Sequence, residues 1–158
     1  MHIIQDSRQH KDKHTTKQAQ FEAAGDKVLV CKLPFGDYAR PPRVSVDTKA
    51  NIKEIAQNVC GGKAEHQRFV RELKLAREFG CLLFILIENE DGVEDLDDLA
   101  RWENPDRKFR PRAPNGLQLS RALSTMQERY GAVFLFCRPE EAAETIKELL
   151  SNDYLRLD

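Results

Sequence analysis

The stretch that decides the fold runs from Gly36 to Lys49 and reads GDYARPPRVSVDTK. From Val44 onward apolar residues alternate with polar ones, and a period of two is typical of a strand with one buried face. The alternation puts Asp47 and Lys49 on the same face, one pleat apart. The prolines in the middle indicate a turn, so we expect Asp37 to return to the same end of the sheet.

Asp37, Asp47 and Lys49 together are typical of metal-dependent phosphodiester cleavage. Two carboxylates can hold a divalent metal ion, and a lysine beside them can hold the attacking water or stabilise charge on the phosphate. Each residue also has an ordinary interpretation, as a turn aspartate or as one half of a salt bridge. We predict Asp37 and Asp47 as catalytic metal ligands, with the Thr48 carbonyl as a third ligand and Lys49 as a catalytic residue.

Composition places the chain among intracellular proteins. Its 158 residues fit one domain, residues 1–158, and the formal net charge of −1 provides no overall basic field, so DNA must be bound by local patches. The four cysteines are widely spaced, and three of them, Cys31, Cys81 and Cys137, lie in or beside apolar strand-like runs, which is typical of buried thiols in a reducing compartment. The start has no apolar leader, and the longest apolar run, residues 81–87, is too short to cross a bilayer. We therefore expect a soluble, cytoplasmic protein.

The hydrophobic pattern predicts an α/β fold with helices on both faces of the sheet. The expected strands are residues 3–8, 27–33, 44–49, 82–87 and 132–137, and the expected helices are residues 18–24, 52–59, 64–79, 91–102, 116–130 and 139–150. Residues 10–17 are expected to form a polar loop, and residues 104–115 a basic, proline-rich one. No strand is followed by a GxGxxG turn or a phosphate-binding loop, so no nucleotide cofactor is expected.

Five short motifs occur in a specific order. They are IQDSRQ at 4–9, GDY at 36–38, VDTK at 46–49, GK at 62–63 followed by EHQ at 65–67, and IE at 87–88. In this order the chain resembles the XPF/MUS-type structure-specific nuclease domain, a branch of the PD-(D/E)xK restriction-endonuclease-like superfamily. The resemblance covers nearly the whole chain. It implies a central mixed sheet flanked by helices on both faces.

The resemblance also implies a function. It indicates a DNA endonuclease that uses Mg²⁺ or Mn²⁺, cuts flapped or branched DNA in repair or recombination, and forms a homodimer where both strands are cut. Asp6 becomes a third catalytic, metal-binding carboxylate, although a salt bridge with Arg8 explains it equally well. No tandem helix-hairpin-helix module follows the motifs, which fits a bacterial or phage-encoded protein.

Three positions depart from the family pattern and favour an alternative function. Gln9 replaces a glutamate, Thr48 an arginine, and Lys53 an aspartate. Glu54 is one residue from the lost aspartate, but with Asn51 it forms the pattern of a capping box. The alternative is a catalytically degenerate subunit that binds DNA or a partner.

Six residues are candidates for DNA binding. They are Lys63, His66, Arg107, Lys108, Arg110 and Arg112. The last four surround one aromatic residue in a segment that we expect to be extended, and which suits phosphate contacts or neutralises the acidic residues of 94–98. His66 could equally be a solvent-facing or capping residue. The cations of residues 68–77 alternate with glutamates, a pattern typical of a solvated helix face.

Overall fold

A computed structural model describes residues 2–8, 11–40 and 44–151 of the chain, and within them a six-stranded sheet forms the centre. The strands are β1 (His2–Asp6), β2 (Lys27–Cys31), β3 (Tyr38–Arg40), β4 (Val44–Lys49), β5 (Leu82–Glu88) and β6 (Val133–Cys137). Their order across the sheet is β2-β1-β3-β4-β5-β6. β3 runs antiparallel to both of its neighbours, and every other pair is parallel. The carboxyl ends of β1, β4 and β5 therefore meet at one edge.

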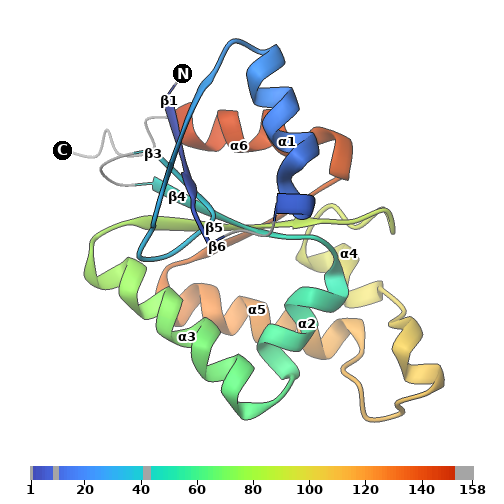
Figure 1. Ribbon diagram of the computed structural model, residues 1–158. Helices are drawn as coiled ribbons and strands as arrows, with labels where there is room; N and C mark the ends of the chain where they lie inside the picture. Colours follow the sequence, from blue (N-terminus) through green and yellow to red (C-terminus); the bar gives the residue numbers. More distant parts are fainter. Residues whose placement is uncertain (1, 9–10, 41–43, 152–158) are drawn as a thin grey trace.

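Helices cover both faces of this sheet, as predicted. They are α1 (Lys11–Ala23), α2 (Ile52–Cys60), α3 (Lys63–Glu78), α4 (Leu96–Arg101), α5 (Gly116–Tyr130) and α6 (Ala142–Ser151), with 3₁₀ turns at Pro105–Lys108 and Pro139–Glu141. Figure 1 shows α1 and α6 on one side of the sheet and α2, α3 and α5 on the other. The mixed sheet in an α/β fold is thus confirmed.

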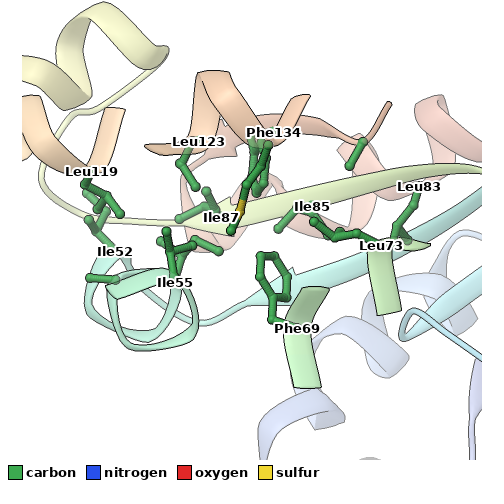
Figure 2. Packing of buried hydrophobic residues seen from close by; sticks show 14 of the residues in the cluster. Ile52, Ile55, Phe69, Leu73, Leu83, Ile85, Ile87, Leu119, Leu123 and Phe134 are labelled. Carbon is green, nitrogen blue, oxygen red and sulfur yellow. The ribbon is translucent and has the colours of Figure 1, made fainter. Parts of the chain in front are cut away.

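Two hydrophobic clusters hold these layers together. In the larger cluster, Ile85 and Ile87 of β5 lie among side chains of α2, α3 and α5 (Figure 2), with Phe69 tilted against Phe134 at a centroid distance of 6.4 Å. In the other cluster, side chains of β1, β3, β4 and β5 pack against α1 and α6. Strand β5 contributes alternate residues to both clusters, which explains its unbroken apolar sequence.

Two predicted elements differ from the structure. Helix α1 begins at Lys11, so the predicted loop over residues 10–17 is wrong from that residue on; its polar sequence has little hydrophobic periodicity. The predicted helix over residues 91–102 is reduced to α4. Asp95 caps α4 by accepting a hydrogen bond from the Asp98 amide at 2.7 Å, and the Asn89 side chain holds the backbone of Val93 in a turn before it.

The cysteines are free thiols, but two of the four are exposed. Cys31 lies on the edge strand β2, so the prediction of a buried thiol is wrong for this residue, and Cys60 lies at the end of α2. Burial raises the pKa of Cys81 to about 11 and, with help from nearby carboxylates, that of Cys137 to about 12. Within the described residues, none of the helices has the length and apolar character needed to cross a bilayer.

Candidate functional site

A glycine turn places Asp37 beside the end of β4. Gly36 has a φ of +71°, a left-handed conformation that favours glycine, and a Cβ at this position would overlap Ser45 Oγ. The Asp37 amide donates to the Val46 carbonyl at 2.8 Å. On the other side of the turn, Asp37 accepts a hydrogen bond from the Asp6 amide through its carbonyl at 2.8 Å. The turn thereby joins the carboxyl ends of β1 and β4.

Thr48 fixes the Asp37 carboxylate. Asp37 Oδ2 accepts hydrogen bonds from the Thr48 amide at 2.9 Å and from the Thr48 hydroxyl at 2.7 Å. A threonine at this position therefore orients the carboxylate through two donors, where the family pattern has an arginine.

Asp47 and Lys49 lie on the same face of β4 and form a buried ion pair. Lys49 Nζ lies 2.6 Å from Asp47 Oδ2, and the two residues are 7% and 5% exposed. The same ammonium lies 5.3 Å from the centre of the Phe69 ring of α3. The cation is thus held between a carboxylate and an aromatic face.

These groups line a cleft of about 520 Å³. Its charged lining consists of the carboxylates of Asp6, Asp37, Asp47, Glu54 and Glu72, and the cations Arg8, Lys49, Arg68 and Arg71. The carboxyl ends of β1 and β4 form one wall, and α2 and α3 form another. All four residues predicted as catalytic are brought together here.

Asp6 belongs to the cleft but is engaged by its neighbours. Arg8 binds it through Nε at 2.8 Å and Nη2 at 2.7 Å, and the Leu33 amide donates to it at 3.2 Å. Burial raises the pKa of Asp6, but the hydrogen bonds from Arg8 and Leu33 outweigh this and hold the pKa below its usual value. The predicted salt bridge with Arg8 is therefore present.

Glu72 is a cleft residue that the sequence analysis missed. Glu72 Oε1 accepts a hydrogen bond from the Gly36 amide at 2.7 Å and so ties α3 to the turn that carries Asp37. A signal was present in the sequence, because Glu72 lies three residues after Phe69 and directly before Leu73, both buried. Arg68 and Arg71 also line the cleft, but both are exposed, so the expected solvated face is present for these two cations and is wrong only for the half-buried Glu72.

The cleft favours positive charge. Burial raises the pKa of Asp47; Lys49 opposes the shift, and Asp37 and Glu72 add to it. Burial lowers the pKa of Lys49, but Asp47, followed by Glu72 and Asp37, more than compensates, and the pKa lies above its usual value. Asp37 and Glu72 thus raise the pKa of both groups, in addition to burial in the case of Asp47, and the negative field of these carboxylates also attracts a metal cation.

The oxygen ligands available in the cleft suit a metal ion whose remaining ligands come from water and substrate. Among residues 2–8, 11–40 and 44–151, no group of three or more histidine, cysteine or acidic side chains could hold a metal by itself. Mg²⁺ is commonly bound by one or two carboxylates, with its remaining ligands from water and phosphate oxygens. Asp37 and Asp47 can provide such a pair.

Comparison with known proteins identifies the fold. No model of a protein family matches the chain, and no curated protein does. The solved structure of XPF from Aeropyrum pernix matches 99% of this chain with a TM-score of 0.67 at 20% sequence identity. The chain has the fold of an XPF-type nuclease domain. This confirms the fold that the motif order implied.

A second solved structure, XPF from Aeropyrum pernix in complex with DNA, matches 94% of the chain with a TM-score of 0.65, also at 20% identity. The present chain spans 67% and 62% of the lengths of the two XPF chains.

Two of the other predicted residues have local structural contacts in this XPF-type fold. Asn51 caps α2 by accepting a hydrogen bond from the Glu54 amide at 2.9 Å, which is one half of the predicted capping box, and Glu54 Oε2 accepts from the amide of Ala50, the residue before the cap, at 2.8 Å. His66 Nδ1 lies 2.9 Å from the Val59 carbonyl and joins the end of α2 to α3. His66 and the exposed Lys63 lie outside the cleft lining, and Gln9 lies outside the described residues.

The basic loop is folded and attached to α2. Lys53, the residue that replaces a family aspartate, forms an ion pair with Asp106 at 2.8 Å. The loop contains the 3₁₀ turn Pro105–Lys108, so the expectation of an extended segment is wrong. Its cations Arg107, Lys108, Arg110 and Arg112 are all exposed. In the acidic segment before the loop, Asp98 pairs with Arg101 of its own helix at 2.5 Å.

Proposed function

We propose that this chain is a divalent-metal-dependent DNA endonuclease that works at the cleft. The observation that carries the proposal is the placement of Asp37, Asp47 and Lys49 at the end of β4, facing about 520 Å³ of open volume. The XPF-type fold supports it, and one structure with this fold was solved with DNA.

Each residue of the cleft would have its own role in cleavage. Mg²⁺ or Mn²⁺, held by Asp37, Asp47 and the Thr48 carbonyl, would supply Lewis-acid activation of water and neutralise phosphate charge. The Lys49 ammonium would donate to the scissile phosphate and stabilise the charge that develops on it. Thr48 orients the Asp37 carboxylate by the two hydrogen bonds described above.

Arg68 and Arg71 extend the site along α3. Both line the cleft and are exposed, and guanidinium groups bind phosphate oxygens in a two-pronged geometry. They would bind the phosphates that flank the cut. Asp6, already bound by Arg8, would reach the metal through water.

The finer function follows from the resemblance. We propose flapped or branched DNA as the substrate, with a role in repair or recombination. One cleft cuts one strand, so cutting both strands symmetrically would require a homodimer.

A degenerate, DNA-binding subunit is the second candidate, and a specific observation favours it. Asp47 is already paired with Lys49, and Asp6 with Arg8, so two of the carboxylates have cationic partners without any metal. This candidate predicts no cleavage with any divalent ion and DNA affinity that EDTA leaves unchanged.

Cleavage of end-labelled DNA separates the two candidates. Single strands, duplex, a flap and a four-way junction would be incubated with Mg²⁺, Mn²⁺ or EDTA. Asp47→Asn and Lys49→Ala would be compared with Asp97→Asn, a matched control on the exposed surface of α4. The nuclease predicts cutting that needs the metal and is lost in both cleft variants but not in the control. Binding without cutting by the unmodified protein would establish the second candidate.

A further inference from the structure

Phe109 is displayed to solvent in the middle of the basic loop. It is 88% exposed, the largest fraction among the large hydrophobic side chains that the structure describes. Four cations, Arg107, Lys108, Arg110 and Arg112, lie within three residues of it, and residues 107–112 contain no acidic side chain. A single exposed apolar side chain is common on protein surfaces, so what distinguishes this ring is the set of four cations beside it.

The loop that presents the ring is built by its own hydrogen bonds. Asn104 is buried; it accepts from the Asp106 amide at 3.0 Å and donates to the Pro114 carbonyl at 2.8 Å, which closes the loop at its base. Arg107 crosses the loop to the Ala113 carbonyl at 2.9 Å. Phe109 itself donates its amide to the Asp106 carbonyl at 3.0 Å. The exposure of Phe109 is therefore a property of an ordered turn.

An ion pair connects this loop to the cleft. Asp106 of the loop binds Lys53 at 2.8 Å, and the next residue of α2, Glu54, lines the cleft. Figure 1 shows the segment after α4 next to α2. DNA that passes through the cleft along α2 would therefore meet the loop.

The chemistry of the loop fits a single strand better than a duplex. Cations alone suffice to bind the phosphates of a duplex, whose bases are stacked on each other and unavailable to a ring. Unpaired bases can stack on an aromatic side chain while nearby cations bind the backbone, and this combination is typical of sites for single strands.

We propose that Phe109 is a stacking platform for an unpaired DNA base, and that the basic loop binds the single-stranded part of a DNA whose cut phosphate lies in the cleft. The placement of the cut phosphate in the cleft rests on the proposed function. The stacking site itself is independent of cleavage. It would give the enzyme a preference for DNA with an unpaired branch close to the cut.

Binding without metal tests the stacking site directly. Oligo(dT) carrying one 2-aminopurine would be titrated in EDTA with the unmodified chain, Phe109→Ala, Phe109→Tyr and Leu117→Ala. Leu117 is exposed in the first turn of α5 and serves as the matched control. Because Phe109 is exposed, its replacement leaves the core unchanged. We expect Phe109→Ala to weaken binding about 5- to 100-fold and to abolish the 2-aminopurine quenching, and Phe109→Tyr and Leu117→Ala to retain both.

Other outcomes overturn the inference. Equal affinity of Phe109→Ala and the unmodified chain for oligo(dT) would do so. A loss of affinity in Phe109→Ala that is as large for blunt duplex as for oligo(dT) would also do so, because it would mean a general phosphate contact. No binding of oligo(dT) by the unmodified chain would also overturn it. The proposed nuclease is tested separately. If the unmodified chain cleaves DNA and Phe109→Ala binds oligo(dT) as tightly as the unmodified chain, only the stacking site is rejected. If binding depends on Phe109 but no DNA is cleaved, only the nuclease is rejected.

Discussion

Two lysine–carboxylate pairs lie at the same edge of the sheet, and one of them lines the cleft. Lys49 pairs with Asp47 at the end of β4, and Lys17 of α1 pairs with Glu88 at the end of β5. Strand register places Lys49 beside Ile87, so the two pairs are close in the sheet. Alternation sends their side chains to opposite faces: Asp47 and Lys49 toward α3, and Glu88 toward α1.

Burial alone does not distinguish the pairs. The side chains of Lys49 and Asp47 are 9% and 7% exposed, and those of Lys17 and Glu88 are 8% and 9% exposed. Their surroundings differ. The first pair faces the cleft with two further carboxylates, Asp37 and Glu72, whereas α1 covers the second. A buried ion pair thus indicates function only when ligands can reach it, and we assign a structural role to the covered pair.

Removal of the covered lysine gives the largest expected loss of stability. Lys17→Ala leaves the Glu88 carboxylate buried without its cation, which should cost about 3–5 kcal/mol of the free energy of unfolding in urea. Lys17→Met combined with Glu88→Gln removes both charges and should cost clearly less. Equal losses for the single and the double variant would contradict a structural role for the pair.

The glycine turn of the cleft should be next in sensitivity. Gly36→Ala adds left-handed strain and a clash with Ser45, so we expect a loss of about 2–4 kcal/mol together with a displaced Asp37. Gly25→Ala is the matched control, since Gly25 has a φ of +76° but open space around a Cβ, and it should cost only about 1 kcal/mol. Urea unfolding of both variants would show whether the cleft turn is the more constrained one.

Glu72 should have a smaller effect on stability. Glu72→Gln keeps an acceptor for the Gly36 amide but loses the charge, which should cost about 1 kcal/mol or less. Glu65→Gln, on an exposed position of the same helix, should cost nothing measurable. A divalent ion should raise the melting temperature of the unmodified chain more than that of Glu72→Gln, because the field that attracts the ion is weaker in the variant. Identical shifts would remove Glu72 from the electrostatics of the cleft.

The sequence predicted those parts of the molecule that depend on neighbours in the chain. Alternation in β4 placed Asp47 and Lys49 on one face, and periodicity found α2, α3 and α5 within a few residues. The Asn51 cap of α2 is also a local pattern, and its hydrogen bond from the Glu54 amide is present.

Long-range contacts were not accessible from local patterns. Glu72 meets Gly36 across 36 positions of sequence, and Lys53 meets Asp106 across a still longer separation, so nothing in the neighbourhood of either residue revealed its partner. Helix α1 was missed in its first half because a helix that covers a sheet with few apolar side chains has little amphipathic signal. The pair of Lys17 and Glu88 was missed because Lys17 lies in this first half, which was expected to be a loop.

The most direct test of the account is metal-dependent DNA cleavage per folded molecule, with Asp47→Asn in the open pair compared with Glu88→Gln in the covered pair. Circular dichroism would first measure the folded fraction of each variant. The account predicts that Asp47→Asn lowers cleavage about 100-fold or more while remaining folded, and that Glu88→Gln cuts like the unmodified chain once normalised. Equal cleavage by Asp47→Asn and the unmodified chain, or loss of cleavage only in Glu88→Gln, would contradict it.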